Sequence, residues 1–109
     1  MIQDFAGAVV APSLMYVNVP WCGYCRKAKP IMEEVGATLG TTVPVISVDG
    51  DQHEIFTKAI GVRSYPTILY VDAEGKMTKF EGERTVQNIV GFVCSKASKG
   101  TYGFCPMSA

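Results

Sequence analysis

Short apolar runs alternate with helix-like patterns along most of the chain. Four runs are rich in Val, Ile and Tyr or are bounded by turn residues, which is typical of strands. They cover residues 14–19, 43–48, 67–71 and 77–80. Because Ala73-Glu74-Gly75 has the composition of a turn, the last two runs are expected to form a hairpin.

Apolar residues recur at steps of three and four between residues 23 and 39, which predicts a long amphipathic helix. This apolar face consists of Ala28, Ile31, Met32, Val35 and Leu39. Pro30 lies inside the pattern and should kink the helix, because proline lacks the N–H donor and crowds the preceding turn.

Two further helices are expected downstream. The first covers residues 52–60, with Asp51 as its expected N-cap, Glu54 at the spacing of a capping box, and Gly61 as the expected stop. The second follows Gly82. Its apolar face consists of Val86, Ile89, Val90, Val93 and Ala97.

The N-terminal segment, residues 2–10, contains Phe5, Val9 and Val10 and predicts a short amphipathic helix that Pro12 ends. The expected order of elements is therefore α-β-α-β-α-β-β-α. A strand, a helix and a second strand in succession require a parallel pair with a right-handed crossover, so we expect an α/β layered fold.

Length and composition favour one domain over residues 1–109, with its core at residues 14–97 and an aperiodic tail at residues 99–109. Ten Lys/Arg against ten Asp/Glu give a net charge of +0, which argues against a nucleic-acid-binding protein. Hydrophobic residues make up 48%, which excludes a disordered chain, yet no apolar run approaches the roughly 18 residues that span a bilayer. Residues 1–10 lack Lys and Arg and include Asp4, so we expect no secretory signal and a cytoplasmic protein.

The four cysteines fall into two groups: Cys22 and Cys25 lie close together, whereas Cys94 and Cys105 lie far downstream. In a reducing compartment, a close pair is more often catalytic or metal-binding than a structural staple. A zinc site needs four ligands, and the sequence has no second close cysteine pair and no histidine pair. Redox exchange is therefore favoured over a zinc site and over a purely structural disulfide.

The motif Trp21-Cys22-Gly23-Tyr24-Cys25 lies between the end of an expected strand and the start of an expected helix. Unpaired N–H groups and the positive end of the helix dipole favour a thiolate at the first cysteine. Such a placement lowers the pKa of a cysteine from about 8.5 to roughly 3.5–7.5. Since the thiolate is the attacking species, Cys22 is the expected nucleophile, and Cys25 is the expected buried thiol that resolves the intermediate.

The motif at residues 21–25, with Pro30 in the same helix, resembles the thioredoxin superfamily. The segment 61–67 resembles the one that holds the family's cis-proline, at Pro66, and Gly82 resembles the glycine after the last strand. The resemblance covers residues 14–97. It implies a three-layer α/β/α thioredoxin-like fold, exchange of disulfides with protein substrates, no bound cofactor and no metal. It also implies a groove that binds substrate, formed by Trp21, Gly23, Tyr24, Tyr65, Pro66 and Gly82.

The sequence departs from the family pattern at several positions. Family members usually carry a buried carboxylate six residues before the first cysteine, where this chain has Tyr16, and a buried Lys where it has Val45. The carboxylate is thought to assist proton transfer at the resolving cysteine, so water or another group must do so here. Tyr24 replaces the family's usual Pro or His, and Tyr neither stiffens the turn as Pro does nor stabilises the thiolate as an imidazolium does. Few residues precede Cys22, so we expect the N-terminal edge strand to be missing and the mixed sheet to have four strands.

Several individual residues have more than one interpretation. Cys94 is a small core hydrophobe or forms a disulfide with Cys105, which would be worth about 3 kcal/mol by loop-closure entropy. His53 is most simply a solvated residue, with a ligand or catalytic role as the alternative. Tyr16 is more often a core aromatic than a proton relay. Trp21 is expected to be exposed and to contact substrate.

Taken together, these features predict a monomeric protein disulfide reductase that takes part in electron transport, with a thioredoxin-reductase-like electron donor. One alternative is an oxidase or isomerase that resembles protein disulfide isomerases. Another is a non-catalytic thioredoxin-fold binding module.

Overall fold

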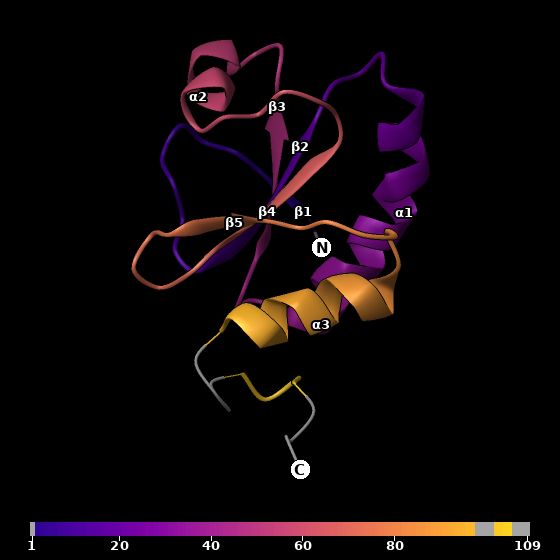
Figure 1. Cartoon of the computed structure of the whole chain (residues 1–109), viewed down its shortest axis with the longest axis vertical. Helices are drawn as coiled ribbons and strands as arrows, with labels where there is room; N and C mark the ends of the chain where they lie inside the picture. Colours follow the sequence, from indigo (N-terminus) through magenta and orange to yellow (C-terminus); the bar gives the residue numbers. More distant parts are fainter. Residues whose placement is uncertain (1, 98–101, 106–109) are drawn as a thin grey trace.

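The computed structural model describes residues 2–97 and 102–105, which form a sheet with helices on both faces. The elements are β1 (Ile2–Asp4), β2 (Ser13–Asn18), α1 (Gly23–Leu39), β3 (Val45–Asp49), α2 (Glu54–Ala59), β4 (Thr67–Val71), β5 (Met77–Lys79) and α3 (Val86–Lys96). The helices α1 and α3 cover one face of the sheet and α2 covers the other (Figure 1). The predicted three-layer α/β/α fold is confirmed.

The sheet has five strands in the order β1-β3-β2-β4-β5. β3 pairs parallel with both β1 and β2, whereas β2–β4 and β4–β5 are antiparallel. Alternate residues of the central strands face opposite sides, so that Leu14 and Tyr16 pack under α1 and α3 while Met15 and Val17 pack under α2. This two-sided core explains the near-continuous burial of β2 and β4.

Residues 2–4 form a strand and residues 5–12 form no helix, so both the predicted helix at residues 2–10 and the predicted four-stranded sheet are wrong. Ile2 pairs with Val45 in register, and the backbone N–H of Phe5 donates to the carbonyl of Ser47 at 2.8 Å. The Phe5 ring stacks on Phe56 of α2, with ring centroids 4.7 Å apart. A three-residue strand is too short to show a period of two, so its pairing with β3 decides its conformation.

The long helix α1 has the predicted bounds. Its inward face is the predicted one, except that Ile31 is only partly buried. The helix places its first turn at the end of the sheet where β2 and β3 end, which is where Cys22 and Cys25 lie (Figure 1).

The predicted N-cap of the second helix is wrong. α2 begins at Glu54 after a turn, and the carboxylate that caps this turn belongs to Asp49, which accepts from the backbone N–H groups of Asp51 at 2.8 Å and Gln52 at 3.2 Å. The Asp51 side chain is used elsewhere, as described below. Gly61 has a φ of +86° directly after the helix, in agreement with its expected role as a stop.

The C-terminal tail is joined to α3 by a disulfide between Cys94 and Cys105, whose Cα atoms are 5.6 Å apart. Tyr102 is buried and shares a hydrogen bond of 2.7 Å with the hydroxyl of Tyr70 in β4. The rest of the predicted tail, residues 99–101 and 106–109, lies outside the described residues. Within the described part of the chain, no helix has the length and apolar character needed to cross a bilayer.

Candidate active site

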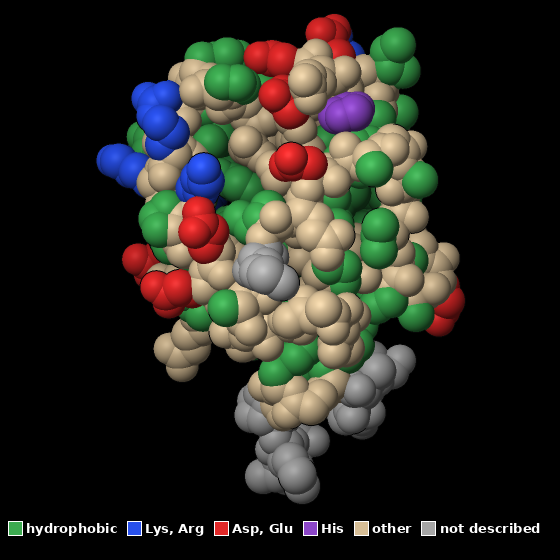
Figure 2. Space-filling view, turned by 180° about the vertical axis from the view of Figure 1, so that it is seen from behind, with side chains coloured by type: hydrophobic (Ala, Val, Ile, Leu, Met, Phe, Trp, Pro, Cys, Tyr) green, Lys and Arg blue, Asp and Glu red, His purple; other side chains and the backbone are tan. Residues whose placement is uncertain are grey.

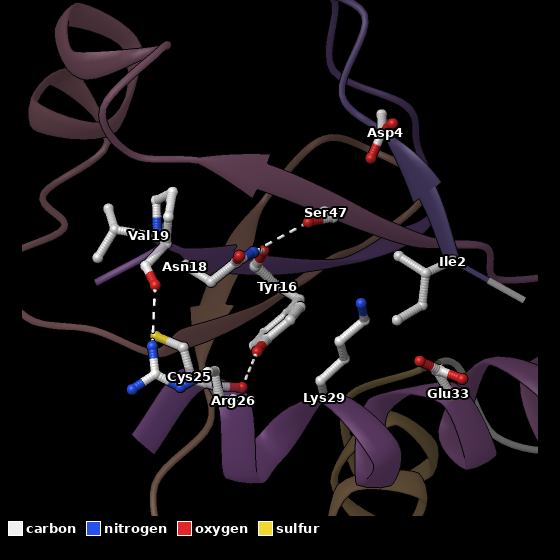
Figure 3. A pocket seen from close by; sticks show the side chains of 11 residues that line it. Ile2, Asp4, Tyr16, Asn18, Val19, Cys25, Arg26, Lys29, Glu33 and Ser47 are labelled. Atoms are coloured by element: carbon white, nitrogen blue, oxygen red, sulfur yellow. Dashed lines mark hydrogen bonds between the residues drawn. The ribbon is translucent and has the colours of Figure 1, made fainter. Parts of the chain in front are cut away.

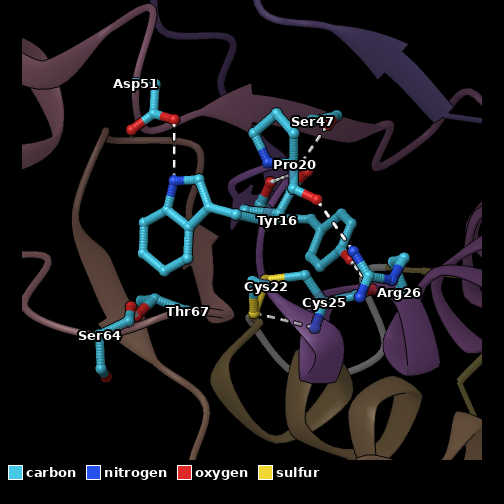
Figure 4. Close-up of a disulfide and its surroundings, with 11 residues drawn as sticks. Tyr16, Pro20, Cys22, Cys25, Arg26, Ser47, Asp51, Ser64 and Thr67 are labelled. Carbon is cyan, nitrogen blue, oxygen red and sulfur yellow. Dashed lines mark hydrogen bonds between the residues drawn. A yellow bond between two sulfur atoms is a disulfide. The ribbon is translucent and has the colours of Figure 1, made fainter.

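The two close cysteines are joined across the first turn of α1. Cys22 is the N-cap residue, and its Sγ accepts a hydrogen bond of 3.0 Å from the backbone N–H of Cys25. The two Cα atoms are 5.2 Å apart and the sulfurs form a disulfide (Figure 4). The predicted placement of Cys22 at the helix N-terminus is therefore confirmed, and the sulfur interacts directly with one of the N–H groups that would stabilise a thiolate.

The pair is largely buried, but its surroundings are not. Cys22 is 8% exposed and Cys25 is 3% exposed, whereas Trp21 and Tyr24 are 67% and 68% exposed. Two large apolar side chains therefore stand in solvent beside the disulfide. Val19 and Tyr65 pack against the two cysteines and complete their apolar surroundings.

The exposed indole of Trp21 is held in a defined orientation. Its Nε1 donates to the carboxylate of Asp51 at 3.0 Å (Figure 4). Its ring meets Tyr65 edge-on, with ring centroids 5.9 Å apart. Asp51 therefore serves the site rather than α2. A single exposed hydrogen bond contributes little to folding stability, but it limits the orientations of the ring above the groove.

The segment before β4 closes the groove on its other side. The peptide bond between Tyr65 and Pro66 is cis, as predicted. A first hollow of about 450 Å³ opens on the Cys22 side and is lined by Trp21, Cys22, Gly23, Tyr24, Arg63, Ser64 and Tyr65. A second hollow of about 230 Å³ is lined by Ser64, Pro66, Ile68, Lys79, Phe80, Glu81, Gly82 and Arg84. The structure thus brings the predicted substrate-binding residues into two adjoining hollows, with Pro66 and Gly82 in the second.

Tyr16 lies beneath Cys22 and Cys25, at the position where the resemblance led us to expect a buried carboxylate. It is 3% exposed, and its hydroxyl donates to the backbone carbonyl of Cys25 (Figure 3). Burial raises the pKa of the Tyr16 hydroxyl, and the positive charge of Arg84 opposes this rise only in part. Tyr16 therefore stays protonated near neutral pH and acts as a hydrogen-bond donor in the core, not as an acceptor of protons.

A third hollow, of about 640 Å³, approaches Cys25 from behind (Figure 3). Its polar wall includes Asn18, whose side-chain amide donates to the Tyr16 carbonyl at 3.0 Å and to Ser47 Oγ at 2.9 Å. Lys29 and Glu33 of α1 also line it. A hollow of this size and polarity has room for water, the simplest group that can accept a proton from Cys25.

Basic side chains gather beside this region. Seen from behind, Lys and Arg side chains cluster over the N-terminal half of α1, which carries Arg26, Lys27 and Lys29 (Figure 2). The Arg26 guanidinium donates to the Pro20 carbonyl at 3.1 Å, and Lys27 Nζ lies 5.8 Å from the centre of the Tyr24 ring. His53 packs edge-on against a phenylalanine ring near α2. Among residues 2–97 and 102–105, no three His, Cys, Asp or Glu side chains gather into a possible metal site.

Comparison with known proteins places the chain in a family. The family model described as Thioredoxin matches residues 3–95. The chain belongs to the thioredoxin family. A protein disulfide-isomerase of Triticum aestivum is 36% identical over 92 residues, which cover 83% of this chain and 17% of that protein. The curated protein disulfide-isomerases that it matches are much longer, and the chain spans between 16% and 24% of their lengths.

Solved structures agree with this assignment. The crystal structure of human ERp44, form I, superposes with a TM-score of 0.78 at 21% identity, covering 90% of this chain and 30% of that one. The first thioredoxin domain of mouse protein disulfide-isomerase A4 has a TM-score of 0.65 at 28% identity, covering 74% of this chain and 59% of that one. The resemblance inferred from residues 14–97 is thus confirmed.

Four residues of this thioredoxin-family site were missed in the sequence. Arg63 and Ser64 line the groove and lie inside the segment 61–67 that was recognised, so their positions could have been inferred from Tyr65. Asp51 and Gly50 gave no such signal. A Cβ atom on Gly50 would lie 2.6 Å from the Tyr65 hydroxyl, so a glycine is needed there to let the Tyr65 ring approach the turn after β3.

Proposed function

We propose that this thioredoxin-family chain reduces disulfides of protein substrates through the Cys22/Cys25 pair. The observation that carries the proposal is the pair joined across the first turn of α1, with Cys22 as the N-cap beside an open hollow. Such a pair opens and closes without moving the rest of the fold, and its first sulfur occupies the position that stabilises a thiolate.

The reaction starts from the reduced pair. The Cys22 thiolate attacks one sulfur of a substrate disulfide, the substrate S–S bond breaks, and a mixed disulfide forms while the first substrate thiolate leaves and takes a proton. Cys25 then loses its proton to water and attacks the Cys22 sulfur. The Cys22–Cys25 disulfide forms, the second substrate thiolate leaves, and two electrons have passed to the substrate. A dithiol or a thioredoxin-reductase-like protein restores the reduced pair.

Substrate binding follows from the two hollows. Trp21 and Tyr24 offer exposed apolar surface, and Gly23 leaves the approach to Cys22 open. The backbone of Tyr65 next to the cis bond lies just before β4, where an extended substrate segment can pair with it as an added strand. Gly82 lines the second hollow without a side chain that would narrow it. The chain acts as a monomer in this proposal.

A second candidate is the oxidase or isomerase activity, which the names of the curated relatives favour. The direction of exchange depends on the redox potential of the pair, and about 30 mV changes the equilibrium by roughly 1.4 kcal/mol. Equilibration of the purified protein with glutathione measures this potential. A value near −270 mV, about that of thioredoxin, supports the reductase, and a value near −180 mV, about that of protein disulfide isomerase, supports the second candidate.

The cytoplasmic location expected from the sequence stays a proposal. The Cys94–Cys105 disulfide makes an oxidising compartment the competing one, because such bonds persist where thiols are not kept reduced. Subcellular fractionation of the protein in its own cells separates the two.

Two variants test the chemistry. Cys25→Ser should accumulate covalent adducts with substrate that a reducing agent releases, because nothing resolves the mixed disulfide. Cys22→Ser should abolish the reduction of insulin disulfides. The double variant Cys94→Ala/Cys105→Ala is the matched control, since it loses two cysteines outside the pair and should keep its activity while it remains folded. Insulin reduction by Cys22→Ser at the wild-type rate would overturn the proposal.

A further inference from the structure

The two hollows of the active-site groove adjoin each other. Ser64 lines both, so the two hollows meet at the loop before β4. The first hollow holds the exposed aromatic side chains beside Cys22, and the second lies between Pro66 and the segment 79–84. A substrate cysteine over Cys22 therefore has neighbours in both hollows.

The charged side chains of these hollows are mostly basic. Arg63 is the one charged residue that lines the first hollow, and Lys79, Arg84 and Glu81 line the second. Three basic side chains against one acidic side chain leave an excess of two positive charges. Among the described residues the ion pair found is Lys58–Glu54, which lies in α2, so Arg63, Lys79 and Arg84 have no acidic partner there. They are exposed and free to meet carboxylates of a substrate.

The nearby acidic side chains do not cancel this excess. Asp51 accepts the indole N–H of Trp21 and lines neither hollow. Glu83 is exposed but lines neither hollow. The excess of basic charge therefore lies in the lining of both hollows.

The first hollow also offers apolar surface. Trp21 and Tyr24 each keep about two thirds of their surface exposed, and Tyr65 meets the indole edge-on. A large apolar side chain of a substrate that covers this exposed aromatic surface removes it from water, which favours binding beside the reactive sulfur.

We propose that this groove selects acidic segments: a disulfide cysteine with a large apolar neighbour and with Asp or Glu on its flanks. The inference rests on the proposed function and names its substrate class. The apolar neighbour covers Trp21 and Tyr24, and the flanking carboxylates meet Arg63 in the first hollow and Lys79 and Arg84 in the second. Charge complementarity of this kind acts mainly on the rate of encounter and weakens as salt is added.

The test uses three peptides as disulfide-linked dimers that carry a self-quenching fluorophore. Each has the same length and the same Phe-Cys pair, and the flanking residues are Glu, Gln or Lys. The full-length protein is first reduced with dithiothreitol and freed of it, and dequenching gives the second-order rate constant. At low salt the Glu peptide should react about tenfold faster than the Lys peptide, with the Gln peptide between them. In 1 M NaCl this ratio should shrink toward one.

Charge-reversal variants locate the effect. Arg63→Glu and Arg84→Glu should each lower the Glu-to-Lys rate ratio severalfold. Lys76→Glu is the matched control, because it makes the same change of charge in the β4–β5 turn outside both hollows, and it should keep the wild-type ratio. Equal rates for the three peptides, or an equal loss of preference in Lys76→Glu, would overturn the inference and leave the proposed function standing. Absence of exchange with all three peptides would instead overturn the proposed function.

Discussion

Removal of the Cys94–Cys105 disulfide should cost the protein a large part of its stability. The perturbation is the double variant Cys94→Ala/Cys105→Ala, which frees the tail without leaving a reactive thiol. The bond spans 11 residues in sequence, and a cross-link of that span restricts the unfolded chain by about 2.8 kcal/mol at 25 °C. Its loss therefore acts mainly through the unfolded state.

The tail also contributes contacts to the folded state. Tyr102 is 7% exposed, and its hydroxyl shares a hydrogen bond with the hydroxyl of Tyr70. A neutral hydrogen bond of this kind contributes about 1 kcal/mol to the free energy of unfolding. If the freed tail leaves β4, this contribution is lost as well. The expected decrease in the free energy of unfolding is therefore roughly 3 to 4 kcal/mol.

Urea unfolding followed by far-ultraviolet circular dichroism measures this decrease. The dependence on urea concentration should also steepen, because the unfolded chain without the cross-link exposes more surface. Tyr102→Phe alone should lower the free energy of unfolding by about 1 kcal/mol, which separates the contribution of the hydrogen bond from that of the disulfide. Ser95→Ala, on the exposed side of α3, is the matched control and should stay within about 0.5 kcal/mol of the wild type. A loss below about 1 kcal/mol in the double variant would refute the loop-entropy reasoning.

Three further predictions concern single side chains. Tyr16→Phe removes the hydrogen bond to the Cys25 carbonyl and should lower the free energy of unfolding by about 1 kcal/mol. The pH profile of disulfide exchange between pH 5 and 9 should stay unchanged. A shifted profile would show that the Tyr16 hydroxyl transfers a proton in the reaction. Gly50→Ala places a Cβ against the Tyr65 ring, so the free energy of unfolding measured in urea should fall by about 1–3 kcal/mol. Disulfide exchange with large peptides should also slow. Exchange at the wild-type rate would show that the position of Tyr65 does not affect the reaction. Burial and the hydrogen bond to Tyr102 raise the pKa of Tyr70. Above about pH 10 the unfolded chain therefore loses the phenolic proton while the folded protein keeps it. The free energy of unfolding should fall as the pH rises from there. Tyr70→Phe should show a smaller fall in unfolding free energy between pH 9 and 11, and an equal fall would assign the effect to other groups.

The local sequence pattern predicted an element correctly where the segment is long enough to show its own hydrophobic period. The long helix α1 and the strand β4 have the predicted bounds, because their apolar spacing and their flanking turn residues are properties of the segments themselves. The cysteine pair and the cis bond before Pro66 were also predictable, since the motif at residues 21–25 and the order of the landmarks after it are written in the sequence.

Tertiary structure decided what short or polar segments do. Residues 2–4 become a strand because β3 offers a free edge, and Phe5 finds Phe56 on the far face. Asp51 has the spacing of a cap but bonds Trp21, 30 positions away in the sequence, because Asp49 already caps that turn. The sequence by itself thus determined the three helices, the strands β2 to β5 and the reactive pair, since these depend on neighbours along the chain. The edge strand, the orientation of the indole and the basic groove depend on contacts between residues far apart in sequence, which the folded chain alone brings together.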